Sequence, residues 1–266
     1  MRTPLAPRPS RRPSNPASDP RERTMAAVTN KQAQLALLQT VLKKKVPNPL
    51  PPEADRPVLD EVLYAILREG ATTEQANIAF AKLREAFFDL NEVRVSSVPE
   101  VADAIHGLPD AGTKSQRIVE FLQEVFEQLY SFDLGDIAKK GVKQAAKQLA
   151  RYKSGVTDFV VAWVTQRSLG GHAVPLDHPT VRVLQRLAIL DAEIDEWETV
   201  RGTLEHYIPK ASGTDFTDRV AVFASTVCTE DRPHCEICPM KADCPYGQEV
   251  LAKAKAKEAA KAKKPK

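Results

Sequence analysis

Hydrophobic residues recur every three or four positions through most of the chain, which is the spacing of one face of an α-helix. Helices are predicted over 32–45, 58–68, from Thr73 onward, and over 113–130, 134–150, 156–167, 178–188, 194–207 and 215–226. Ser97 followed by Pro99 adds a further helix start, with a capping side chain before a proline in the first turn. Since no useful stretch alternates apolar and polar residues, the sequence predicts an all-α fold.

The segments between and beyond these helices have a different composition. Residues 1–30 are rich in Pro, Ser and Arg without periodicity, so we expect them to be disordered. The proline-rich stretch 46–57 cannot continue a helix. After Tyr246 the chain is rich in Ala and Lys, and it predicts a solvated helix that has no apolar face to bury. In the helix from Thr73, we expect Ile78, Leu83 and Phe87 to face inward.

Charge is distributed unevenly along the chain. Residues 1–24 hold six Arg against two acidic residues, which gives +4, and residues 251–266 hold seven Lys against Glu258, which gives +6. Because the whole chain carries +3, the part between the two tails carries −7. The basic tails either hold the protein near a polyanion through counterion release or serve as solubilising extensions.

The chain contains no export or membrane signal in its sequence. No apolar run reaches the roughly 18 residues that a membrane span needs. The N-terminus lacks the apolar core of a secretory signal, and six prolines within the first twenty residues would break an amphipathic transit helix. Met25 is an alternative first residue. We therefore expect a cytoplasmic protein without disulfides.

Four cysteines, the only ones in the chain, lie within seventeen residues near the C-terminus. Cys228, Cys235, Cys238 and Cys244 are separated by six, two and five residues, among several prolines. Thiolates are soft ligands for Zn or iron–sulfur clusters. A structural Zn site usually shows two close cysteine pairs, whereas this segment has one. The spacing favours an iron–sulfur cluster, with Zn and an unligated segment as alternatives.

This cysteine spacing after an apolar helix resembles the iron–sulfur loop of the endonuclease III branch of the helix–hairpin–helix DNA glycosylases. The resemblance covers about residues 57–246. It implies a [4Fe–4S] cluster that is mainly structural, and a loop that presents Arg232, His234 and Lys241 to DNA phosphates. It also implies a helical barrel over 57–171, an iron–sulfur domain made from 31–56 and 172–248, and a site in the cleft between them. Residues 249–266 form the basic tail.

The stretch from Pro175 to Val183 resembles the family's V-D-T-H-x-x-R-V sequence, which carries the catalytic aspartate. The resemblance makes Asp177 the catalytic candidate. In the family a nucleotide is flipped into a pocket, where a carboxylate stabilises positive charge at C1′ or activates the nucleophile. Asp177 also stands where a helix should begin, so it is a candidate N-cap as well. The family's gap-filling glutamine aligns with Ala71, which is too small for that task.

The helix–hairpin–helix motif is degenerate. The family has L-P-G-V-G-x-K, and the aligned residues here are 149–155, with both hairpin glycines replaced. The position of the Schiff-base lysine is Gly155, so a lyase step through that amine cannot occur there. The candidate DNA-binding residues of this hairpin are Arg151, Tyr152, Lys153, Ser154 and Gly155.

A second stretch, residues 108–114, also looks like the hairpin and would make Lys114 the nucleophile. Lys114 lies 63 residues before Asp177, whereas the family has fewer than twenty residues between the two. Gly155 lies 22 residues before Asp177, so the alignment on Gly155 is preferred. Lys114 is then expected on a helix surface or in contact with a phosphate.

The resemblance implies a DNA N-glycosylase of base-excision repair, monofunctional if active, that works on double-stranded DNA as a monomer. It would associate with the nucleoid if it binds DNA. The alternative is a catalytically inactive nucleic-acid-binding or scaffold protein on the same fold, because fold does not establish function. An open polar cleft at Asp177 would favour the enzyme, and a buried apolar box would favour the scaffold.

Overall fold

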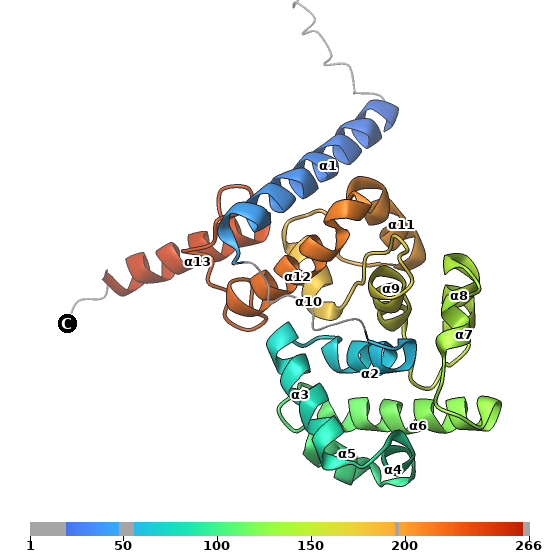
Figure 1. Cartoon of the computed structure of the whole chain (residues 1–266). Coiled ribbons are helices and arrows are strands. Elements are labelled where there is room, and N and C mark those ends of the chain that lie inside the picture. The colour runs from blue at the N-terminus through green and yellow to red at the C-terminus, as the bar shows by residue number, and fades with distance from the viewer. Residues whose placement is uncertain (1–19, 48–55, 195–196, 263–266) are drawn as a thin grey trace, which may run out of the picture.

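The computed structural model describes residues 20–47, 56–194 and 197–262, and the secondary structure of these residues is entirely helical (Figure 1). The helices are α1 (Pro20–Lys45), α2 (Val58–Arg68), α3 (Thr73–Ala86), α4 (Leu90–Val95), α5 (Val98–Ala104), α6 (Ala111–Leu129), α7 (Gly135–Ala138), α8 (Val142–Leu149), α9 (Asp158–Arg167), α10 (His178–Arg186), α11 (Trp197–Tyr207), α12 (Lys210–Thr226) and α13 (Pro245–Ala262). The all-α prediction is confirmed. None of these helices is long and apolar enough to cross a membrane.

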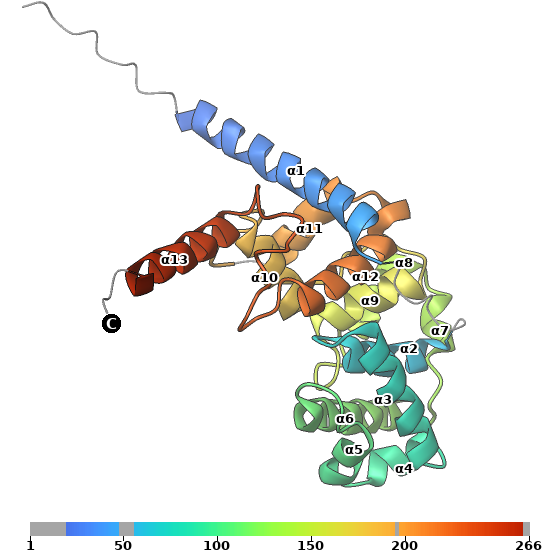
Figure 2. The same cartoon turned by 90° about the vertical axis from the view of Figure 1, so that its left-hand side faces the viewer.

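One hydrophobic core is formed by α2–α9. The apolar face of α2 lies at its centre, where Val62, Leu63 and Ile66 are fully buried. The long helix α6 contributes Ile118 and Phe121 to the same core. Both views show α3–α6 gathered at the end of the molecule away from α1 and α13 (Figures 1 and 2).

A second hydrophobic core joins the N-terminal helix to the C-terminal third of the chain. Leu38 and Leu42 of α1 pack with Val183 of α10 and Val220 of α12. The cysteine segment closes this core, since Cys244 belongs to it and Cys228 and Cys238 pack against it. Segments that are far apart in sequence therefore share one core.

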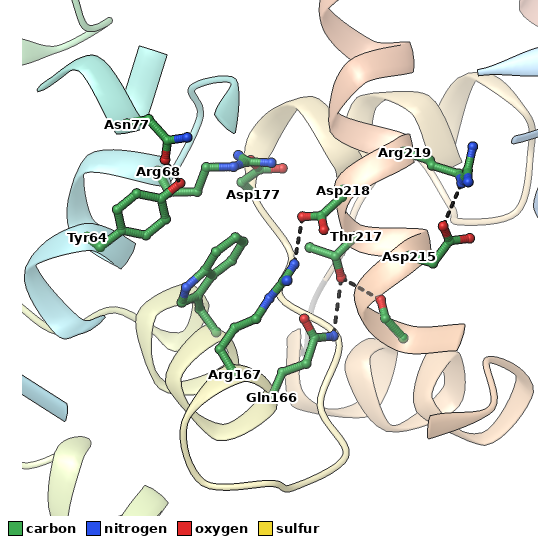
Figure 3. Close-up of polar contacts among 12 residues, drawn as sticks. Tyr64, Arg68, Asn77, Gln166, Arg167, Asp177, Asp215, Thr217, Asp218 and Arg219 are labelled. Atoms are coloured by element: carbon green, nitrogen blue, oxygen red, sulfur yellow. Dashed lines mark hydrogen bonds and ion pairs between the residues drawn. The ribbon is translucent and has the colours of Figure 1, made fainter. Parts of the chain in front are cut away.

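A buried polar seam joins the two cores where α2, α9, α10 and α12 meet (Figure 3). Arg167 of α9 forms an ion pair of 2.6 Å with Asp218 of α12, and its guanidinium lies over the Trp163 ring. The Trp163 Nε1 donates to Glu61 of α2 at 2.6 Å. Buried charges are tolerated because each has a partner, so the seam fixes the geometry between the two cores.

Several helix starts follow from local chemistry. Thr72 caps α3 and Ser97 caps α5, each in a reciprocal capping box with the residue three positions later. The predicted bounds of α2 are confirmed, and the predicted cap at Ser97 is confirmed. At the C-terminus, α13 forms the predicted helix, and residues 252–257 are exposed.

Other predictions were wrong in detail. The single helix predicted over 134–150 is divided into α7 and α8, because Gly141 has a φ of +78°, which a helix cannot contain. Helix α4 was not predicted. Ile78 was expected inside and is 52% exposed, although Leu83 is buried as expected and Phe87 packs against the core. Helix α1 begins at Pro20, within the stretch 1–30, and residues 1–19 lie outside the described residues.

Candidate active site and cysteine cavity

Asp177 is the N-cap of α10 and is almost fully buried. Its Oδ1 accepts from the backbone N–H of Thr180 at 3.0 Å, which satisfies one of the free donors at the helix start. Its Oδ2 accepts from the backbone N–H of Gly70 at 3.2 Å and lies 3.7 Å from Arg68 Nη1. A carboxylate has about four acceptor positions, so these contacts leave capacity for a further donor.

A cleft of about 220 Å³ opens beside Asp177. Its walls come from the turn after α2, the start of α10, α12 and the segment after Cys228. The lining residues are Gly70, Ala71, Thr72, Gln75, Asp177, Pro179, Arg182, Ala221, Ala224, Ser225, Thr229 and Glu230. The lining combines small apolar side chains with polar groups of both charges.

Ala71, which aligns with the gap-filling glutamine of the family, lies in the turn that forms one wall of this cleft. Its carbonyl oxygen accepts a hydrogen bond from Arg68, whose guanidinium is fully buried. The turn is tight, and Gly70 has a φ of +71°, a backbone region that L-residues rarely adopt. Arg68 and Gly70 were not singled out from the sequence, because their partner Asp177 lies more than a hundred residues away.

The candidate hairpin residues divide into two groups. Arg151, Lys153 and Ser154 are exposed in the turn between α8 and α9. Tyr152 is 1% exposed, and its ring packs edge-on against Phe121 at 5.5 Å between centroids. The structure therefore differs from the expectation that the Tyr152 side chain faces DNA.

Gly155 is buried against α6. A Cβ atom at this position would stand 2.8 Å from the carbonyl oxygen of Arg117 and would overlap the Cβ of Phe121. The Gly155 carbonyl oxygen accepts two bonds from the Arg117 guanidinium, at 3.0 and 3.2 Å. Glycine is required here by close packing, and its own atoms face α6 rather than solvent.

Lys114 is buried, not on the helix surface where it was expected. Its Nζ donates to the carbonyl oxygens of Leu67 at 2.8 Å and Glu69 at 2.6 Å, at the C-terminal end of α2. Burial lowers the pKa of Lys114 to about 8, and the nearby Glu69 carboxylate opposes that shift. A side chain held in this way is not presented to a phosphate.

The four cysteines line one cavity of about 20 Å³ at the edge of the second core. Cys235 and Cys244 are buried, Cys228 and Cys238 are half-buried, and all four are free thiols. The remaining lining is largely apolar and includes Leu187, Phe223 and Met240. Burial raises the pKa of the Cys235, Cys238 and Cys244 thiols.

Two arginines of α10 hold the start of the cysteine segment, and the sequence analysis missed both. Arg182 donates to the carbonyl oxygens of Cys228 and Ala224 at 3.2 and 3.1 Å. Arg186 donates to the carbonyl oxygen of Thr229 at 2.6 Å and to the Sγ of Cys228 at 3.5 Å. The signal was the spacing of four residues between the two arginines, which places them one helical turn apart, but nothing in the sequence showed what they contact.

The donor set is of the kind that binds iron–sulfur clusters. Four thiols surround one cavity, and cationic and N–H groups stand close to the sulfur atoms: Arg186 at Cys228, and the backbone N–H of Gly247 at 3.3 Å from Cys244 Sγ. Within the described part of the chain, no group of three or more His, Cys, Asp or Glu side chains is arranged to hold one metal ion. The exposed Arg232, His234 and Lys241 lie on the same segment.

No family model matches the sequence, and no curated protein matches it. Solved structures do. A trapped endonuclease III–DNA covalent intermediate, the estranged-adenine complex, has a TM-score of 0.63 at 19% identity, covering 83% of this chain and 98% of that chain. A non-covalent endonuclease III–DNA complex has a TM-score of 0.65 at 18% identity, with the same coverage of both chains. The fold is that of endonuclease III.

A thermostable thymine-DNA glycosylase shares this fold, with a TM-score of 0.57 at 17% identity, covering 84% of this chain and 99% of that chain. The endonuclease III fold thus extends over nearly the full length of these neighbours. The activity of this chain is a separate question, because fold alone does not establish it.

Proposed function

We propose that the chain is a DNA N-glycosylase of base-excision repair that acts without an AP-lyase step. The observation that carries the proposal is the position of Asp177 at the wall of an open cleft with polar groups. The endonuclease III fold and the glycosylase neighbours support the class of reaction. No lysine can stand at position 155, which supports the absence of a Schiff-base step at that position.

In this reaction a flipped nucleotide enters the cleft and Asp177 faces its sugar. The bond between C1′ and the base breaks, and its electron pair leaves with the base, which takes up a proton. A water molecule adds to C1′ and gives its proton to the carboxylate, which also stabilises positive charge at C1′. The Thr180 and Gly70 N–H groups keep the carboxylate in place for this role.

We further propose that Cys228, Cys235, Cys238 and Cys244 hold a [4Fe–4S] cluster. The single cavity that they line and the donors beside their sulfur atoms support it. The two hydrophobic cores support a division into a helical barrel over 57–171 and an iron–sulfur domain over 31–56 and 172–248. When bound, such a cluster supplies structural cross-linking of the segment, and Arg182 and Arg186 orient its first cysteine.

Double-stranded DNA is the proposed partner. Arg151, Lys153 and Ser154 are exposed at the α8–α9 turn, where they suit contacts with phosphate oxygens. Arg232, His234 and Lys241 are exposed on the cysteine segment and provide a second set. Phosphate contacts of this kind set orientation on the duplex and carry no base preference.

Replacing Asp177 with asparagine is expected to reduce base excision by about a hundredfold or more, because the carboxylate charge is lost. Asparagine still caps a helix, so α10 is retained. The assay follows strand breaks in duplexes with uracil, oxidised pyrimidines, mismatched adenine or an abasic site, with and without hot alkali. We expect breaks in the damaged-base duplexes only after alkali.

The matched control is Asp136→Asn, which changes an exposed carboxylate of α7 and leaves the rate unchanged. Strand breaks without alkali, together with a covalent protein–DNA complex that borohydride traps, would contradict the proposal and point to a lysine nucleophile. If the folded protein excises no base from any of these duplexes, the alternative is favoured: an inactive nucleic-acid-binding or scaffold protein. The −7 charge of the chain between the tails agrees with the scaffold form of that alternative, in which DNA binding has been lost.

The Lys-rich C-terminal tail is expected to contribute salt-dependent DNA affinity. Replacing its seven lysines with glutamine should make the dependence of log K on log salt less steep by about 0.9 for each lysine that contacts a phosphate. Engagement of about half of them gives a change of about 3. The measurement is fluorescence anisotropy on an undamaged duplex, and a change below about 1 would identify the tail as a solubilising extension.

A further inference from the structure

The end of α2 and the turn after it, residues 67–71, lie between α6 and Asp177 and contact both. On the α6 side, Lys114 Nζ donates to the carbonyl oxygens of Leu67 and Glu69. These carbonyls belong to the last turn of α2 and the residue after it, where helices leave acceptors without internal partners. A lysine at this end also suits the negative end of the helix dipole.

Arg117 lies one turn further along α6 and holds the side chain of Glu69. Its Nη2 donates to Glu69 Oε2 at 2.8 Å, and Thr157 Oγ1 donates to the same oxygen at 3.0 Å. The Arg117 guanidinium also bonds to the Gly155 carbonyl oxygen, as described above. Glu69 is therefore fixed at both its backbone and its side chain.

The opposite side of the same turn faces Asp177. The peptide between Glu69 and Gly70 points its carbonyl oxygen at Lys114 and its N–H at Asp177 Oδ2. Arg68, from the same turn, bonds to the Ala71 carbonyl oxygen and pairs with Asp177. One peptide plane thus connects the lysine to the carboxylate, and a rotation of that plane would break both bonds.

We propose that Lys114 and Arg117 are positioning residues for Asp177. They fix the 69–70 peptide so that the Gly70 N–H stays aimed at the carboxylate and the cleft wall keeps its shape. Neither is a nucleophile: Lys114 donates to carbonyl oxygens at the end of α2, Arg117 donates to Glu69 and to Gly155 in the α8–α9 turn, and neither lines the cleft. This inference rests on the proposed function only where it refers to the chemistry of Asp177.

The geometric part is tested by hydrogen exchange at the Gly70 amide in the full-length protein, which needs no substrate. In Lys114→Met the side chain keeps its length but donates nothing, so we expect Gly70 to exchange at least tenfold faster. Amides in the interiors of α2 and α6 should not change. The control is Lys139→Met, an exposed lysine of the same type, which should leave Gly70 as in the wild type.

Equal acceleration of all α2 and α6 amides would show a merely structural lysine and overturn the proposal, as would an unchanged Gly70. If Lys114→Met does not fold, Arg117→Gln is the second variant, and Arg117→Lys should restore part of the protection. In base excision by Lys114→Met, kcat should fall about tenfold relative to the wild type, while KM stays within twofold. An inactive wild type with the expected exchange pattern would refute the proposed function and leave the positioning intact.

Discussion

Lysine at position 155 is expected to unfold the α8–α9 turn and not to create a Schiff-base nucleophile. The first side-chain carbon already has no space, because it would stand 2.8 Å from a backbone carbonyl oxygen of α6 and overlap Phe121. A backbone atom within a long helix cannot move aside as a flexible side chain would. For Gly155→Ala we expect a loss of about 3 kcal/mol in the free energy of unfolding, and more for Gly155→Lys.

Urea denaturation measures this loss, and Gly112→Ala is the matched control. Gly112 lies in the first turn of α6, and an added Cβ there would meet nothing within 4 Å. Alanine at that position should be neutral or stabilise by up to about 1 kcal/mol. A folded Gly155→Lys protein that borohydride traps on abasic DNA would refute the packing argument.

The helices were predictable because their causes are local. The apolar period of α2 and the capping pair of Ser97 and Glu100 are visible in the sequence itself. The division of α7 from α8 was missed because Gly141 looks like a tolerated helix glycine, and only its positive φ reveals the break. Local pattern therefore gives the elements, and backbone geometry decides their ends.

The candidate site was only partly predictable, because its partners come from distant parts of the chain. Asp177 was expected as a helix cap and is one. Its contacts to Gly70 and Arg68 depend on where the end of α2 and the following turn lie relative to the start of α10, and no sequence period encodes that position. Lys114 was expected near the surface, and its burial follows from carbonyl acceptors that lie 45 and 47 residues away.

The degenerate hairpin, residues 149–155, shows that an alignment by sequence spacing does not reveal which side chains are buried. The sequence showed that Gly155 lacks an amine, but not that Phe121 and α6 exclude any side chain there. It placed Tyr152 among the DNA-binding candidates, whereas packing against Phe121 removes the ring from the surface. Of that set, the three exposed polar residues remain as proposed phosphate contacts.

Replacing Cys238 with serine is expected to remove the proposed cluster and destabilise the second core. The four cysteines are the whole thiolate set of the chain, so none can substitute for another. Without the cluster, the apolar-lined cavity between the four cysteines loses the group that would link them to the second core. Metal binding that completes a site contributes directly to folding, so we expect a loss of at least about 3 kcal/mol, or roughly 10 °C in Tm.

Iron and sulfide content, visible absorbance and thermal denaturation together test this prediction. The wild type should be brown with about four irons per chain, and the variant colourless. Ile237→Ser is the matched control, because Ile237 lies beside Cys238 but is 75% exposed, and it should keep colour and stability. If the wild type is colourless and contains Zn, the Zn alternative is correct. If the Tm of Cys238→Ser is unchanged, the cysteines are unligated.

Hydrogen exchange should show where the loss of the cluster acts. Because Cys244 belongs to the second core and no cysteine belongs to the first, faster exchange in Cys238→Ser should appear in α10 and α12 before it appears in α2.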